Sequence, residues 1–163
     1  MSQASAVLRE ALIRNFNQAR DEVAFSHGER FQSTDDDLVN REVAPGLGAV
    51  ITSVQPGKTS CPYHLHHAQT EMFVVVEGSG TLRVAGEMLP ISVGDVITIP
   101  PGGTYPHHII NTSDKQLRYL SISTREQPEL CEYPDSQKTM GFVRGGHRVM
   151  NRSANNLDYF DGE

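Results

Sequence analysis

The sequence predicts an all-β protein made of antiparallel strands around a single core. Short apolar or alternating segments recur between residues 47 and 123, and each ends at a turn that contains Gly, Pro, Asn or Asp. These strands do not alternate with helical segments, which argues against a parallel α/β fold. The length of 163 residues suits one domain better than two. We therefore expect an antiparallel sandwich or barrel.

The N-terminal segment is expected to begin with a short amphipathic helix. Leu8, Leu12 and Phe16 recur every four residues, so that they would share one face of a helix over residues 5–16. The three adjacent aspartates at residues 35–37 lie outside any metal-ligand spacing, and we interpret them as a solvated turn or a helix cap.

The central segment is expected to hold the strands. The run M-F-V-V-V at residues 72–76 is almost continuously apolar, which predicts a strand buried on both faces, and the E-G-S-G sequence after it predicts a hairpin turn. The strands are expected at Leu47–Val54, 62–67, 72–76, 81–85, 88–91, Val96–Ile99, 106–110 and 117–123.

The last part of the chain is expected to be an extended coil that packs over the core, because residues 132–163 are polar and include two adjacent glycines. The resulting organisation is a single domain in three parts. Residues 1–46 form an arm on the barrel, residues 47–125 form the barrel core, and residues 126–163 form a C-terminal extension with a coil-like tail.

Composition excludes several classes of function. The formal net charge of −6 and the lack of a basic stripe argue against nucleic-acid binding. No apolar run approaches the length needed to cross a bilayer, and the N-terminus lacks the apolar core of a signal peptide, so we expect no membrane association and a cytoplasmic location. Cys61 and Cys131 are expected to be free thiols.

A set of potential metal ligands is the most informative feature of the sequence. His64 and His66 are one residue apart, so that their side chains point to the same face of a strand. Glu71 can join them after a turn, and a third imidazole from a distant strand, at His107, would complete three nitrogens and one oxygen. This set suits a divalent transition metal. His67 and the residue after His107 alternate to the opposite face and are expected to point outward or to contact the ligands from behind.

The two segments that carry these residues are P-Y-H-L-H-H-A-Q-T-E-M-F at 62–73 and P-P-G-G-T-Y-P-H-H-I-I-N at 100–111. Together they resemble the two signature motifs of the cupin superfamily. The chain looks most similar to small, single-domain bacterial cupins of sugar-phosphate-isomerase-like or uncharacterised function. The resemblance implies a double-stranded β-helix, the cupin jelly roll. It also implies that His64, His66, Glu71 and His107 are the metal ligands.

Four protein ligands leave about two positions open on an octahedral cation. Nitrogen and oxygen ligands suit one divalent Mn, Fe, Co, Ni or Zn ion, and the sequence does not rank these metals. Three functions compete. The first is isomerase or epimerase chemistry on a small, sugar-like or sugar-phosphate metabolite, and it is the one that we favour. The second is a metal-dependent dioxygenase, and the third is a non-catalytic module that binds a small ligand.

The remaining polar residues leave the mechanism open. Tyr63, Tyr105 and Tyr119 are candidate acid–base residues that the sequence does not rank. Arg83 and Arg118 could bind an anionic substrate, or they could be ordinary surface residues. The expected partners are a small-molecule ligand and a second copy of the chain, because paired jelly rolls can cover their sheet edges. No role is assigned to His27, His147, Cys61 or Cys131.

Overall fold

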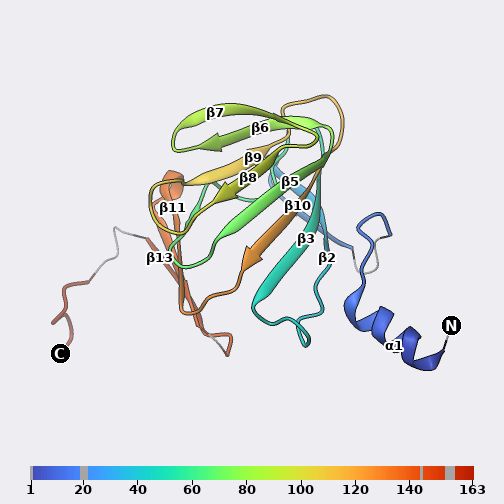
Figure 1. Ribbon diagram of the computed structural model, residues 1–163. Helices are drawn as coiled ribbons and strands as arrows, with labels where there is room; N and C mark the ends of the chain where they lie inside the picture. The colour runs from blue at the N-terminus through green and yellow to red at the C-terminus, as the bar shows by residue number, and fades with distance from the viewer. Residues whose placement is uncertain (1, 19–21, 144, 153–156) are drawn as a thin grey trace.

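The computed structural model describes residues 2–18, 22–143, 145–152 and 157–163. Within these ranges the chain is built mostly of β-strands, preceded by one short helix, so the expected all-β class is confirmed. All of the strand pairs are antiparallel. Figure 1 shows the strands as two layers that curl around a common interior.

The largest sheet forms one wall of the jelly roll. Its strands, in spatial order, are β1 (Val23–His27), β2 (Phe31–Asp37), β3 (Leu47–Val54), β10 (Leu117–Thr124), β5 (Glu71–Glu77) and β8 (Val96–Ile99). The strands β3 and β8 have the bounds that the sequence predicts.

Two smaller sheets form the opposite wall. One has the order β13 (Arg148–Arg152), β12 (Lys138–Phe142), β11 (Glu129–Tyr133) and β4 (Leu65–His66), and the other has the order β7 (Glu87–Ser92), β6 (Ser79–Val84) and β9 (His107–Ile110). A backbone bridge between His64 and His107 links them beside β4 and β9. The core between the walls consists of Val54, Phe73, Val75, Leu82, Ile91, Ile99, Ile109, Leu117 and Tyr119.

Strand β5 shows how the pleat selects the residues that face the interior. Glu71, Phe73 and Val75 alternate inward and are buried, whereas Met72 is 38% exposed. The prediction that this strand is buried on both faces is therefore wrong: the central strands of an antiparallel jelly roll have one buried face. The pleat brings Glu71 to the interior at the start of β5.

The N-terminal helix α1 (Gln3–Leu12) begins at Ser2, whose hydroxyl accepts a hydrogen bond from the backbone N–H of Ser5. None of its residues is buried, and Leu8 and Leu12 are about 60% exposed. Figure 1 shows the helix to the side of the barrel, below β2 and β3.

The three aspartates at residues 35–37 belong to strand β2 and form neither a turn nor a cap, which corrects the interpretation from sequence. Strand β2 pairs with β3, with Asp35 opposite Thr52. Because side chains alternate along a strand, Asp35 and Asp36 point to opposite faces. Asp36 is 3% exposed.

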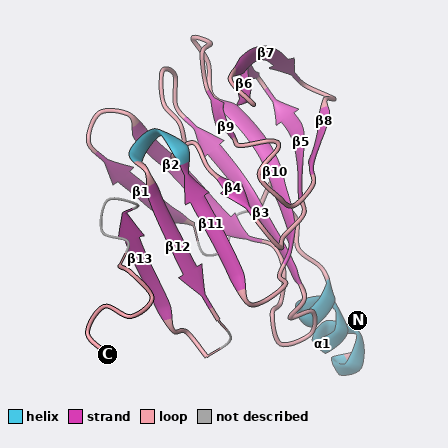
Figure 2. Ribbon diagram, turned by 90° about the vertical axis from the view of Figure 1, so that its left-hand side faces the viewer, coloured by secondary structure: helices cyan, strands magenta, loops and turns pink. Residues whose placement is uncertain are grey.

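The C-terminal extension differs from the expected coil. It contributes β11, a short 3-10 helix (Pro134–Ser136), β12 and β13, which Figure 2 shows side by side on one face. The pairing is clear in the register, because all five residues of β13 are paired with those of β12. Its side chains are exposed throughout, so the strand has no apolar alternation that sequence could reveal.

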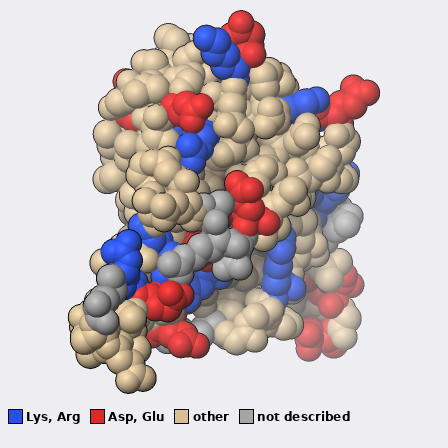
Figure 3. Space-filling view, turned by 90° about the vertical axis from the view of Figure 1, so that its right-hand side faces the viewer, with Lys and Arg blue, Asp and Glu red and all other residues tan. Residues whose placement is uncertain are grey.

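The surface carries mixed charge. On the face shown in Figure 3, acidic and basic side chains are scattered among uncharged ones and do not form a basic stripe. Among the described residues, no helix has both the length and the apolar character needed to span a membrane.

Candidate metal centre

The backbone holds two of the expected ligands next to each other. The N–H of His64 donates to the carbonyl of His107 at 3.1 Å, and the N–H of His107 donates to the carbonyl of His64 at 2.7 Å. Residue His66, two positions along, is paired with Cys131 in β11, and its carbonyl accepts from the N–H of Gly102. The sequence predicts a six-residue strand here, whereas the structure has the short strand β4, which pairs with β11 and follows the His64–His107 bridge.

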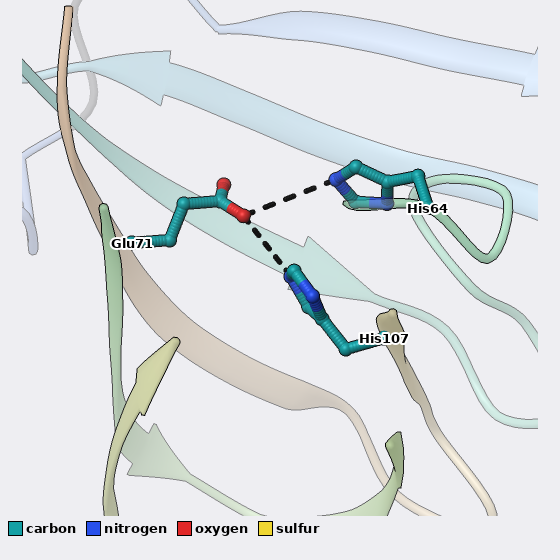
Figure 4. A group of neighbouring side chains, drawn as sticks. All are labelled: His64, Glu71 and His107. Atoms are coloured by element: carbon teal, nitrogen blue, oxygen red, sulfur yellow. Dashed lines mark ion pairs between the residues drawn. The ribbon is translucent and has the colours of Figure 1, made fainter. Parts of the chain in front are cut away.

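Three of the expected ligands, the histidine rings, converge on one carboxylate oxygen of the fourth, Glu71. The Oε2 atom of Glu71 lies 3.0 Å from Nε2 of His107, 3.6 Å from Nε2 of His66 and 3.9 Å from Nε2 of His64. Figure 4 shows the carboxylate pointing between the rings of His64 and His107. The exposed fractions of these side chains lie between 1% and 16%.

In His64 and His107, the hydrogen bond made by Nδ1 determines which ring nitrogen carries the proton of a neutral imidazole. Nδ1 of His64 is 2.9 Å from the carbonyl oxygen of Pro62, and Nδ1 of His107 is 3.1 Å from that of Tyr105. A carbonyl can only accept, so each Nδ1 must carry the proton and donate it. In its neutral form, each ring therefore presents an unprotonated Nε2 to the carboxylate of Glu71.

Acceptor atoms that face one another repel unless a cation lies between them. With the proton of His107 on Nδ1, the buried Oε2 of Glu71 and Nε2 of His107 have no hydrogen-bond partner among the described residues, whereas a second proton on this ring would join the two atoms across their 3.0 Å contact. Ligand atoms about 2.1 Å from a metal, at neighbouring corners of an octahedron, are about 3 Å apart. The observed spacings of 3.0 to 3.9 Å around Glu71 therefore fit a bound divalent cation after a small contraction.

His66 is held from behind by two buried residues of β11 that the sequence did not single out as site residues. Its Nδ1 lies 3.2 Å from Sγ of Cys131 and 3.6 Å from Oε1 of Glu129. The carboxylate of Glu129 also accepts from the backbone N–H groups of His67 and Ala68. A carboxylate behind a metal-binding imidazole fixes the ring's orientation and tautomer. The signal in sequence is weak, since E-L-C-E-Y reads only as a polar alternation.

The protonation states match what a metal requires. Burial raises the pKa of Glu71, but a hydrogen bond from His107 and the positive charge of the His66, His64 and His107 rings in their protonated forms outweigh it and lower that pKa. Burial lowers the pKa of His66. Near neutral pH the carboxylate is therefore ionised and His66 is neutral, which is the ligand form. Burial raises the pKa of Cys131 to about 12, so its sulfur stays a thiol and supports the ring without competing as a thiolate ligand.

The cluster opens onto a cavity of about 270 Å³ inside the barrel, which His64, Glu71 and His107 help to line. Of the three candidate tyrosines, Tyr119 lines this cavity, and its hydroxyl lies 2.8 Å from Oγ of Ser60. The Tyr63 hydroxyl instead accepts from the N–H of Gly86, and Tyr105 is 43% exposed. The structure therefore brings one of the three tyrosines to the cavity with the histidines.

Two further histidines and the two cysteines lie around the site, and His108 is among the residues that line the cavity. His67 points outward and pairs with Glu132 at 2.7 Å, as expected. His108 differs from the expectation of an outward ring, because it is 2% exposed and packs edge-on against Tyr63. Both cysteines are free, and Cys61 also lines the cavity.

The comparison with known families agrees with this geometry. Residues 50–123 match the family model of the cupin domain. This segment is a cupin domain. The matched segment contains all four expected ligands of this cupin and the strands β4, β5 and β9 that carry them.

One curated protein and two solved structures are similar to this chain. The chain is 32% identical over 73 residues to an uncharacterised protein of Methanocaldococcus jannaschii, a match that covers 42% of this chain and 57% of that protein. A proposed sugar phosphate isomerase from Acidithiobacillus ferrooxidans has a TM-score of 0.78 at 23% identity, covering 91% of this chain and 97% of its own. A sugar phosphate isomerase of the cupin superfamily from Silicibacter pomeroyi has a TM-score of 0.72 at 20% identity, covering 90% and 96%. The two TM-scores and the coverages show a shared fold along nearly the whole chain.

Proposed function

We propose that this cupin binds one divalent transition metal through His64, His66, Glu71 and His107, and that it isomerises or epimerises a small hydroxylated metabolite. The observation that carries the proposal is the convergence of ring nitrogens on the Glu71 carboxylate at the edge of a cavity. Such a donor set fits a divalent cation, and the cavity beside it supplies room for a substrate.

Two further observations support this chemistry over other uses of the fold. The cavity presents hydroxyl groups from Ser60, Tyr119 and Ser121, which match the hydrogen-bonding groups of a sugar-like compound. One solved structure of the same fold is that of a sugar phosphate isomerase, and another is that of a proposed sugar phosphate isomerase. A fold hosts many activities, so the names add to the argument from the cavity and do not replace it.

The chain's own residues would divide the work in a simple way. A divalent cation on the four ligands would supply Lewis-acid polarisation of a carbonyl or hydroxyl oxygen. Burial raises the pKa of Tyr119, so its hydroxyl stays protonated and, with Ser60, orients a substrate oxygen by hydrogen bonding. Phe73 and Ile109 supply the apolar part of the wall that excludes water.

The test is reconstitution followed by a substrate screen. The protein is stripped with a chelator, reloaded separately with Mn(II), Fe(II), Ni(II) and Zn(II), and incubated with aldoses, ketoses and their phosphate esters in deuterated water while dissolved oxygen is recorded. We expect about one metal per chain and metal-dependent conversion of an aldose, a ketose or an epimer, without loss of oxygen. Deuterium in the product, detected by NMR, indicates proton transfer through an enediol, whereas conversion without deuterium indicates a hydride shift within the substrate.

Each alternative has its own outcome in this screen. Substrate-dependent consumption of oxygen by the Fe(II) or Ni(II) form identifies a dioxygenase. Tight binding of a sugar without turnover identifies a binding module. Absence of bound metal after reconstitution would remove the basis of the proposal.

A further inference from the structure

Asp35 is a carboxylate in the same cavity that sequence analysis did not connect with the histidines. It lies on β2, and its register partner on β3 is Thr52, which is in turn opposite Tyr119 on β10. These three residues form a row across the sheet, and all three line the cavity together with Glu71. Three strand spacings separate β2 from β5 in the sheet order, so Asp35 and Glu71 reach the cavity from strands that are not neighbours.

The carboxylate of Asp35 is only partly satisfied. Oγ of Ser33 donates to its Oδ2 at 3.5 Å, whereas its buried Oδ1 has no hydrogen-bond partner among the described residues. Burial raises the pKa of Asp35, which hydrogen bonds from Thr52 and Ser33 only partly offset. A buried polar oxygen without a partner costs free energy, and a ligand hydroxyl could recover this cost.

The cavity lacks the groups that bind a phosphate. No Lys or Arg from the described residues is among those that line it. Arg83 and Arg118, which the sequence offered as candidates for binding an anionic substrate, are paired with other residues outside the cavity. Arg83 binds Asp135 through two hydrogen bonds of 2.6 and 2.9 Å, and Arg118 binds Glu77 and the carbonyl of Phe16.

We infer that the cavity takes an uncharged, hydroxyl-bearing substrate, held at one end by the metal-ligand cluster and at the other by Asp35. This inference rests on the proposed function and specifies its substrate class. Glu71 offsets one of the two positive charges of a divalent cation, and no cationic side chain of the described residues lines the cavity to hold a phosphate ester. A phosphate would instead approach an unpaired carboxylate without a guanidinium or ammonium partner.

The size of the cavity agrees with this substrate class. A volume of about 270 Å³ is at the lower end of ligand pockets, which suits a free sugar or a similar polyol. Asp35 contacts the end of the substrate farther from the metal, so its role is recognition. Its loss should raise KM more than it lowers kcat.

The test measures binding, so that it does not depend on turnover. The Zn(II)-loaded protein is titrated with free pentoses and hexoses and with a phosphate ester of each, and binding is followed by saturation-transfer NMR. We expect at least one free sugar to bind about tenfold more tightly than its phosphate ester. Asp35→Ala should weaken that binding about tenfold or more, whereas Asp35→Asn, which keeps a hydrogen-bonding group and removes the charge, should narrow the gap between sugar and ester.

The matched control is Asp37→Asn, in the same strand, because Asp37 is exposed and pairs with Arg41 outside the cavity. It should bind sugars as the unmodified protein does. Phosphate esters that bind as tightly as free sugars, sugar binding unaffected by Asp35→Ala, or no binding of either class would overturn the inference. Metal and free-sugar binding without any conversion would instead refute the proposed catalysis and leave the role of Asp35 standing.

Discussion

The thiol sulfur of Cys131 lies 3.2 Å from Nδ1 of His66, on the edge of the ring opposite the nitrogen that faces Glu71. Glu129, two residues earlier on β11, approaches the same nitrogen at 3.6 Å and is fully buried. Strand β11 therefore supports the proposed metal ligand His66 from behind, through a pair of buried side chains. The C-terminal extension, residues 126–163, thus contributes two side chains around His66.

Glu129→Gln should weaken metal binding, because an amide orients the His66 ring less strongly than a carboxylate does. Loss of such a supporting carboxylate typically lowers metal affinity about 10- to 100-fold. The measurement is competition with a chromophoric chelator. Glu132→Gln is the control, since this exposed residue of the same strand pairs with His67. Equal affinities in the two variants would contradict the supporting role of Glu129.

His66→Ala should abolish most metal binding, whereas His67→Ala should leave it nearly unchanged. The two histidines are adjacent in sequence, but Nε2 of His66 faces Glu71 and the His67 ring points outward to Glu132. Metal content per chain, measured by elemental analysis after reconstitution and desalting, compares them directly. Equal metal content in both variants would refute the ligand assignment.

Gly78→Ala should destabilise the fold much more than Gly57→Ala. Both glycines have a positive φ, of 78° and 74°, so an alanine costs about 1 kcal/mol at either position from backbone conformation. At Gly78 the added Cβ would also lie 2.3 Å from the carbonyl oxygen of Gln116, whereas at Gly57 nothing lies within 4 Å. The difference in unfolding free energy, measured with urea, should reach about 2 kcal/mol or more. Similar values for the two variants would show that the loop before β10 yields freely.

Sequence predicts those parts of this protein whose signal is local. The bounds of β3 and β8 follow from apolar segments between turns, and the shared face of His64 and His66 follows from strand alternation. That the distant His107 joins them is expected from the resemblance of the two motifs to those of cupins. The rest depends on pairing between distant segments. Strand β13 forms because β12 offers a free edge, and its exposed side chains carry no pattern.

The same limit explains why the cavity was only partly anticipated. Asp35 lies in a run of three aspartates, which reads as a solvated turn until its strand is placed beside β3. Glu129 and Cys131 reach His66 only because β11 pairs with β4, across more than 60 residues of sequence. A composition rule cannot detect a contact that the tertiary fold creates.

The protein should form a homodimer through surfaces that include α1. Leu8 and Leu12 are four residues apart on this helix and remain about 60% exposed, which is unusual for a helix with apolar periodicity. Light scattering should give twice the chain mass of 18.0 kDa at micromolar concentration. The double variant Leu8→Ser, Leu12→Ser should shift the mass toward the monomer, whereas Arg9→Gln should not. A monomeric mass for the unmodified protein would rule out the dimer.

The stability of the metal-free protein should fall as the pH drops below about 6.5, and His108 should contribute to this fall. Burial lowers the pKa of His108 to about 4, with Arg83 and Arg30 acting in the same direction and the Cys61 backbone and Asp135 opposing them. The unfolded chain therefore binds a proton between about pH 6.5 and pH 4 that the folded chain does not, so the unfolding free energy decreases as the pH is lowered. This difference amounts to about 1–2 kcal/mol between pH 7 and pH 5.

Urea unfolding should show a smaller loss of unfolding free energy over this interval in His108→Gln than in the unmodified protein. His27→Gln, an exposed control, should behave as the unmodified protein does. An identical loss in all three proteins would mean that His108 does not carry this pH dependence.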